Sequence, residues 1–501
     1  MTHRHLLLIA LLVSFLANQN SPVWGQDNRQ QQTGVAGGGS FADFASLIDL
    51  IQTTVVPDTW DALGGPSSMR EYPQGVYVDP SGTLLACETV AQSDSLANLE
   101  SMLQSNSDSD AGQNWLAEST LRCVSLTRLK DAWMNRQAGF SKPTESMVHM
   151  AGLSKVRYVM LTDDDIVLAG PVGGIESHQG WVRDRQTGLA AIRLDFLSTT
   201  IAAARSKASF GCTIDPTKQG LQNAAKVAAN IQSKSIPIGL AAEELASAIG
   251  MQRIEVFGTA ADTPIGLMMV EADRHMKQLA LGIHPMPAEV ANYLDAIDTT
   301  IQQNAAQGPP NDLLLRLWFT ANACQVRSDT DRRVFQIDGD AMRLSGQNER
   351  AMADGQRGHV IDDPRTKIFV DSFNGNASKI RSKYPIYAGL QSIYESAVVA
   401  AIADKYAASK SHESLLDFFA ATSSSASLGL PIPKQVQTIA VMHRTRSGKQ
   451  RHNILIASGG VAVKPSGTVA MDLVVDPTLR SFQNMPGDRP KVIQRWWWDA
   501  N

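Results

Sequence analysis

The sequence TPIGLMMVEADRHMKQLALG, residues 263–282, carries the clearest secondary-structure signal in the chain. Thr263 can cap a helix, and Pro264 suits the first turn because a proline has no amide hydrogen to leave unbonded there. Apolar side chains then recur every three or four residues, and Gly282 can end the helix. The stretch therefore predicts an amphipathic helix over 264–281 that packs its apolar face against a core.

The polar side of this predicted helix carries a candidate polar site. Asp273, Arg274, His275 and Lys277 lie close together along it. Asp273 and Lys277 are four residues apart and can form an ion pair worth about a few tenths of a kcal/mol. One interpretation is a histidine base beside an arginine that holds a carboxylate or phosphate. The other interpretation, which we favour, is an ordinary solvated helix face.

Outside this helix, helical and β patterns mix without the regular strand–helix alternation of a doubly wound sheet. We therefore predict a multi-domain α+β protein. Its expected parts are a small α+β adaptor module over 41–92, a central α+β domain over 114–345, a helical segment over 363–420 and an antiparallel C-terminal β segment over 436–498.

Three local predictions follow from periodicity and turn chemistry. Apolar spacing predicts a helix over 115–134. Asp338-Gly339 is a strong turn pair and predicts a hairpin of the two apolar runs beside it. In the small module we predict a helix that ends at Pro57, followed by a hairpin whose strands, 75–78 and 83–90, flank an Asp-Pro-Ser-Gly turn.

The N-terminal residues read as a targeting segment. A short, partly basic start precedes an apolar run from Leu6 to Ala17, which is too short to span a bilayer. Val23 and Gly25 then fit a cleavage position, so residues 1–25 are expected to be a signal peptide and 26–40 a flexible linker. We expect an exported protein, periplasmic or extracellular, with no transmembrane span in the mature chain.

Charge and motifs exclude several function classes. The 501 residues carry a net charge of only −4, so a general affinity for nucleic acid is not expected. GxSxG, HExxH, P-loop, GxGxxG and EF-hand motifs are absent from the sequence. We therefore predict no catalytic residues, no cofactor and no metal ligands. The acidic run Asp163–Asp165 is interpreted as a solvated hairpin tip rather than a cation site.

Two groups of residues are candidate binding surfaces. Arg444, Arg446, Lys449 and Arg451 surround a predicted turn, and this basic hairpin could contact an anionic partner. The second group is the aromatic run Trp496, Trp497 and Trp498, which is either an exposed interaction patch or a tail packed on the body of the protein.

The cysteines allow a disulfide in an exported protein. Four are present, without a CxxC pair, which makes a zinc cluster or a thioredoxin-like site improbable. Cys212 and Cys324 are the best candidates for a bridge. Buried thiols are the alternative, given equal weight.

Two resemblances extend this picture. Leu47-Ile48-Asp49-Leu50-Ile51, Pro57, Trp60 and Gly64-Gly65-Pro66 resemble a short module of many exported planctomycete proteins, including secretin-like ones. The segments FGCTIDPT, VEADRHMKQLALGI, LWFTANACQV and SKYPIYAGLQSIYESAVVAAI resemble a family of large exported planctomycete proteins defined only as a domain of unknown function. The resemblance implies no activity and no catalytic residue set.

Together these observations predict an exported, non-enzymatic binding or assembly protein whose partner is an envelope or secretion-associated protein. The alternative is a hydrolase that acts on an envelope or extracellular polymer through an unrecognised acid/base site. A hydrolase would need a cleft in which ionisable groups with perturbed pKa values converge.

Overall fold

The structure is a computed structural model that describes residues 52, 68–72, 75–79, 95–103, 114–178, 180–304, 313–350, 352, 354–355, 359–422, 432–446, 451–488 and 495–500. The chain divides into two compact units, Met1–Cys87 and Glu88–Asn501. In the first unit, β1 (Ser68–Tyr72) and β2 (Gly75–Asp79) form an antiparallel hairpin. Of the helix predicted before Pro57 only Gln52 is described, and it is helical; the strand predicted over 83–90 lies outside the described residues.

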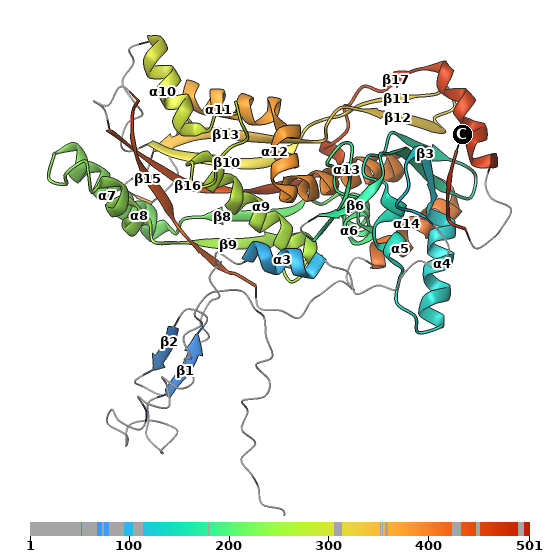
Figure 1. The fold of residues 1–501 in the computed structure, drawn as a ribbon, viewed down its shortest axis with the longest axis horizontal. Helices are drawn as coiled ribbons and strands as arrows, with labels where there is room; N and C mark the ends of the chain where they lie inside the picture. The colour runs from blue at the N-terminus through green and yellow to red at the C-terminus, as the bar shows by residue number, and fades with distance from the viewer. Residues whose placement is uncertain are drawn as a thin grey trace, which may run out of the picture. The chain divides into compact units, whose positions relative to one another are not determined.

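The second unit contains two large sheets, which we call the first and the second sheet (Figure 1). The strands of the first sheet are, in spatial order, β13 (Met342–Arg350), β10 (Leu313–Ala321), β16 (Arg451–Val463), β8 (Phe210–Asp215), β9 (Met251–Phe257) and β14 (Gln435–Gln437). β15 (Ile439–Arg444) pairs with the first half of β16. β10 and β16 run parallel, whereas the other neighbours are antiparallel.

The second sheet combines segments from distant parts of the sequence. Its strands are, in spatial order, β17 (Val474–Val475), β11 (Gln325–Ser328), β12 (Val334–Asp338), β4 (Tyr158–Leu161), β5 (Ile166–Val172), β3 (Ser119–Ser125) and β18 (Trp497–Asp499). β6 (Ile175–His178) and β7 (Trp181–Asp184) form a separate hairpin. The last described residues of the chain thus form one edge of the second sheet, beside β3.

Helix α13 (Pro385–Tyr406) lies in the centre of this unit and packs against α6 (Leu194–Arg205) and α9 (Pro264–Ala280) (Figure 1). The other α-helices are α3 (Ser95–Leu103), α4 (Leu126–Ala138), α5 (Glu145–Val148), α7 (Lys218–Gln232), α8 (Ala241–Ile249), α10 (Tyr293–Asn304), α11 (Pro364–Gly375), α12 (Ala377–Lys383) and α14 (Lys410–Thr422). The described 3-10 helices include η4 (Met150–Gly152), η6 (Pro465–Gly467) and the longer η7 (Pro477–Asp488).

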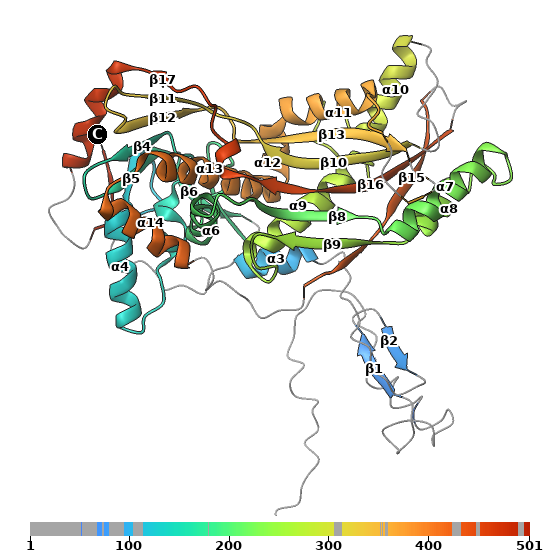
Figure 2. The same ribbon diagram turned by 180° about the vertical axis from the view of Figure 1, so that it is seen from behind.

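Apolar side chains fill both faces of the first sheet. Leu315, Leu317 and Phe319 of β10 face the main core, which also includes the apolar side chains of α9 and α13. On the opposite face, Leu314 and Leu455 belong to a smaller core with α7 and α8. α11 packs against β13, and α10 lies beside α11 (Figure 2). Because helices cover both faces, polar residues of these helices are also drawn into the interior.

The predicted fold class is confirmed as a multi-domain α+β fold. The segments expected to be separate, 114–345, 363–420 and 436–498, nevertheless build one compact unit. The reason is visible in the strand order, because β16 from the last segment pairs with β8 and β10 from the central one. The 363–420 segment contributes helices to the same unit, and its α13 packs against α6 and α9 of the central segment.

The helix predicted over 264–281 is confirmed as α9. The Thr263 hydroxyl accepts a hydrogen bond from the Gly266 amide at 3.2 Å, which satisfies one of the free donors at the helix start. Beyond Ala280, the Gly282 residue takes a positive φ of 69°, a conformation in which glycine carries no side-chain penalty. Capping residues thus located the helix correctly.

Two other local predictions, the helix over 115–134 and the hairpin at Asp338-Gly339, were wrong. Residues 119–125 of the helix predicted over 115–134 form strand β3, and only the following residues are helical. The Asp338-Gly339 turn exists, with a φ of 99° at Gly339, but β12 and β13 on its two sides join different sheets. A turn pair reverses the chain, whereas strand partners are chosen by the apolar surfaces that each strand must cover.

Candidate functional site

The predicted polar site on α9 is buried, and its charges are paired internally. Asp273 and Lys277 form an ion pair of 2.8 Å, with their side chains 0% and 6% exposed. Asp273 Oδ1 also accepts a hydrogen bond from the Gly460 amide of β16 at 2.7 Å. A Cβ atom at Gly459 would come within 2.6 Å of both Asp273 Oδ1 and Lys277 Cε. Glycine at this position therefore makes room for the pair beneath β16.

Burial dominates the electrostatics of this pair. It raises the pKa of Asp273, against the lowering effects of the Lys277 ammonium and the Gly460 amide. The solvated helix face that we favoured from the sequence is wrong, because the first sheet and α13 enclose this side of α9. The i,i+4 pairing of Asp273 with Lys277 is confirmed.

Arg274 and His275 point to different partners from those of Asp273 and Lys277. Arg274 pairs with Glu271 one turn earlier at 2.8 Å. His275 Nδ1 forms a hydrogen bond of 2.9 Å with the Tyr387 hydroxyl of α13. Burial, with smaller contributions from His284 and Arg274, lowers the pKa of His275 to about 3. The four predicted residues therefore do not converge on a shared substrate position.

A second ion pair, between a buried carboxylate and a partly exposed lysine, was not predicted from the sequence. Lys155 Nζ lies 2.6 Å from Glu395 Oε1, and the Glu395 side chain on α13 is 1% exposed. Gln391 donates a hydrogen bond to the same carboxylate oxygen at 3.0 Å, and burial raises the pKa of Glu395. The available signal was a single charged residue within the otherwise uncharged helical stretch 385–403. Such a residue requires a buried partner.

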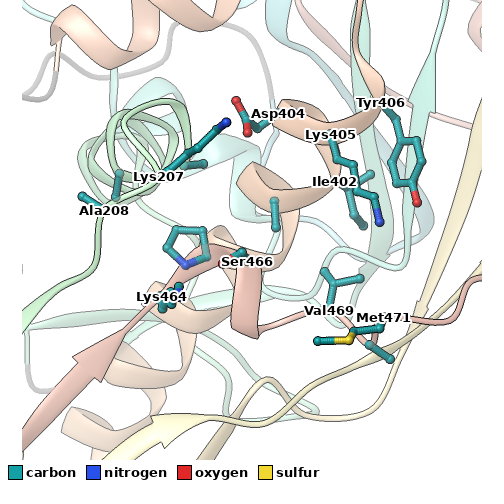
Figure 3. A pocket seen from close by; sticks show the side chains of 15 residues that line it. Lys207, Ala208, Ile402, Asp404, Lys405, Tyr406, Lys464, Ser466, Val469 and Met471 are labelled. Carbon is teal, nitrogen blue, oxygen red and sulfur yellow. The ribbon is translucent and has the colours of Figure 1, made fainter.

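A hollow of about 430 Å³ opens where α6 and α13 end and η6 begins (Figure 3). Apolar side chains form most of its floor: Ala203, Ala204, Ile402, Pro465 and Val469. Lys207, Lys405 and Lys464 lie around it, each from a different segment and each exposed. Sequence analysis missed this arrangement because its lysines are separated by 198 and 59 residues in the chain (207 to 405, then 405 to 464).

The basic hairpin is partly neutralised by α10. Arg446 Nη2 lies 2.5 Å from Asp295 Oδ1, and its Nε lies 3.5 Å from Asp298 Oδ2. Arg444 and Arg451 pair in register at the ends of β15 and β16. Lys449 lies outside the described residues. Arg446 thus also forms ion pairs with α10 although its side chain is 69% exposed, and the binding role of the hairpin stays a prediction.

The three C-terminal tryptophans are buried, so an exposed aromatic patch is not formed. Trp496, Trp497 and Trp498 are 5%, 2% and 3% exposed. Two guanidinium groups lie near the Trp497 ring, with Arg122 Cζ at 4.6 Å and Arg495 Cζ at 4.7 Å from its centroid. Strand pairing of β18 with β3 draws the aromatic run into the core, in agreement with the packed-tail alternative.

The predicted bridge between Cys212 and Cys324 is not formed. Both are buried thiols, and the alternative given equal weight is therefore the one observed. Burial raises the pKa of Cys212 above its usual range and that of Cys324 to about 12, so both stay protonated at neutral pH. Unreactive thiols of this kind pack as small apolar side chains.

The acidic run at 163–165 is not wholly solvated. Asp165 is buried and accepts hydrogen bonds from the Ser125 hydroxyl at 2.6 Å and the Thr127 amide at 3.0 Å. It therefore anchors the start of α4. Among the residues that the structure describes, no group of three or more His, Cys, Asp or Glu side chains is arranged to hold a metal ion.

Comparison with known proteins adds one family. The chain contains a domain described as "Protein of unknown function (DUF1598)", matched over residues 212–293. The match runs from β8 to the start of α10, so it includes the Asp273–Lys277 pair but none of the hollow's three lysines. No curated protein and no solved structure matches the chain. The molecule is thus an α+β protein that carries a DUF1598 domain.

One described helix, α13, has the length and apolar composition that a membrane crossing requires. In this fold 94% of its most apolar window is buried within the protein. Its apolar residues therefore serve as the core around which α6 and α9 pack.

Proposed function

We propose that this chain is a non-enzymatic binding or assembly protein of the cell envelope. Three sequence features support the proposal: the signal-peptide pattern over 1–25, the resemblance of 47–66 to a module of exported secretin-like proteins, and the absence of known catalytic motifs. An envelope or secretion-associated protein is the partner class that these features favour.

The observation that carries the proposal is the separation of the two buried carboxylates with raised pKa values, Asp273 and Glu395, from the hollow. Asp273 and Glu395 have raised pKa values, but each carboxylate is buried and paired with a lysine, at 2.8 Å and 2.6 Å respectively. Neither lines the hollow between α6, α13 and η6. A hydrolase needs such a group beside its substrate, whereas an internal ion pair serves the fold.

The test separates binding from hydrolysis. The purified full chain is incubated with isolated cell envelopes, and two quantities are measured: the protein that sediments with them and the soluble polymer fragments released. We expect saturable co-sedimentation and no release above that of heat-denatured protein. Catalytic release of fragments by the wild-type chain, lost in Asp273→Asn or Glu395→Gln, would instead establish the hydrolase. Absence of saturable co-sedimentation would also overturn the proposal.

A further inference from the structure

We propose that the hollow between α6, α13 and η6 binds a free, single-chain anionic amphiphile. The anionic group lies among Lys207, Lys405 and Lys464, and the alkyl chain covers the apolar floor. This inference rests on the proposed binding function and gives it a small ligand, which is a different partner from the envelope protein.

The rim of the hollow has an excess of positive charge. Within the described part of the chain, Lys207, Lys405 and Lys464 form no ion pair, since no described carboxylate oxygen lies within 4.0 Å of their ammonium groups. The carboxylate on the rim, Asp404, lies 4.0 Å from Arg205 and is thus partly neutralised already. Several cations around one concave surface attract an anion more strongly than a single exposed lysine does.

Lys207 occupies a backbone conformation that favours glycine. Its φ is 54°, and its amide donates to the Ala204 carbonyl at 3.0 Å while the next amide, of Ala208, donates to Ala203. This pair of bonds is the Schellman arrangement that ends many helices, usually with glycine at the left-handed position. The chain carries a lysine there instead, which places a cation beside the hollow.

The ends of two helices explain part of this charge but not all of it. Lys405 lies in the last turn of α13 and Lys207 follows α6, so both complement the negative ends of these helices. Lys464 follows strand β16 and precedes a three-residue 3-10 helix, so it has no corresponding role. Complementing a helix end therefore does not account for the third lysine at this rim.

The apolar floor of the hollow indicates that the ligand also carries an apolar part. Ala203, Ala204 and Ile402 reach the hollow from buried positions, and Met471 on its rim is 96% exposed. A small inorganic anion would leave this apolar surface in water, whereas a neutral alkane would leave the lysines without a counter-charge. The volume of about 430 Å³ lies within the range of small-molecule sites. A ligand with an anionic head and an alkyl chain complements both the lysines of the rim and the apolar floor.

The experiment titrates the full chain with dodecanoate below its micellar concentration, by calorimetry. Dodecyltrimethylammonium tests the sign of the charge, and butyrate tests the alkyl chain. The variants are Lys207→Gly, Lys464→Gln and their combination. The matched control is Lys234→Gly, because Lys234 ends α7 with the same Ser-Lys sequence, a φ of 64° and the same pair of amide bonds, yet does not line the hollow.

We expect saturable binding of dodecanoate, weakened about two- to fivefold by each lysine substitution and unchanged in Lys234→Gly. Butyrate should bind at least about a hundredfold more weakly, and the cationic analogue should not compete. Equal affinity of wild type and the double variant, no binding of dodecanoate, or binding only to anionic phospholipid vesicles would overturn the inference. If the double variant loses dodecanoate binding but still sediments with envelopes, the proposed function does not depend on this ligand site.

Discussion

Asp273 and Lys277 form an ion pair of 2.8 Å on one face of α9, with both side chains inside the protein. Burying two charges costs free energy, which mutual attraction and hydrogen bonds must offset. Here the Gly460 amide supplies one such bond and the missing side chain of Gly459 supplies the space. The pair therefore ties α9 to the middle strand of the first sheet.

The first prediction concerns the stability of this pair. Lys277→Met should lower the free energy of unfolding by about 3–5 kcal/mol, because it leaves the Asp273 carboxylate buried without its cation. Adding Asp273→Asn should restore most of that loss, since the asparagine oxygen can still accept from the Gly460 amide. Urea denaturation of the three proteins measures both effects. A double variant that is less stable than Lys277→Met would show that the carboxylate has another essential partner.

The second prediction concerns acid stability through His275. Its pKa is about 3 in the folded protein and about 6.5 in a model peptide. Between these values the unfolded chain binds a proton that the folded chain does not. Stability is therefore complete above pH 6.5 and falls on acidification toward pH 3, by about 1.4 kcal/mol per pH unit for this group.

His275→Gln should remove that contribution, because glutamine keeps a hydrogen bond to Tyr387 without titrating. Unfolding free energies at pH 7, 6 and 5 measure the slope, which should be smaller in the variant than in wild type. The buried His149, whose pKa burial also lowers to about 3, leaves a residual slope. His359→Gln, at an exposed position, serves as the control. Equal slopes in wild type and His275→Gln would mean that His275 is protonated in the folded protein.

The third prediction concerns the C-terminal strand. Trp497→Ala should cost about 3–5 kcal/mol, because the ring is 2% exposed and its loss leaves a cavity beside Arg122. Chemical denaturation with near-UV circular dichroism reports the loss of stability and of aromatic packing. An unchanged denaturation midpoint would show that Trp497 is not buried, and the aromatic run would again be a candidate binding surface.

The fourth prediction concerns the two lysines with left-handed backbone. Lys207→Gly and Lys234→Gly should each raise the free energy of unfolding by roughly 0.5–1 kcal/mol, because glycine removes the Cβ penalty that exceeds its entropic cost. Both helices end in the same way, so the two gains should agree. Thermal melts in parallel measure them. A loss of stability in Lys207→Gly alone would show that the Lys207 side chain holds the fold together.

Local signals in the sequence located individual helices and turns, but they did not show which strands pair with one another. Thr263, Pro264 and Gly282 placed α9 because capping depends on neighbouring residues. The Asp338-Gly339 turn was also located, but its two strands enter different sheets, a choice made by residues far away in the chain. Strand β16 (Arg451–Val463) shows the same limit, since it pairs with β8 (Phe210–Asp215), which lies more than 200 residues earlier in the chain.

The candidate site shows a related limit. Periodicity assigned the polar side of α9 to solvent, which is correct only for a helix with one covered face. Here β16 and α13 enclose α9, and its charges pair with each other or with β16. The hollow was beyond prediction because Lys207, Lys405 and Lys464 meet only after α6, α13 and β16 have packed.

The most direct measurement of the central claim is the envelope affinity of Asp273→Asn/Lys277→Met, compared with wild type by co-sedimentation. Circular dichroism first verifies that the double variant is folded. We expect equal affinities, because this pair is buried and ties α9 to β16. A folded double variant that no longer sediments with envelopes would instead show that Asp273 and Lys277 belong to the binding site.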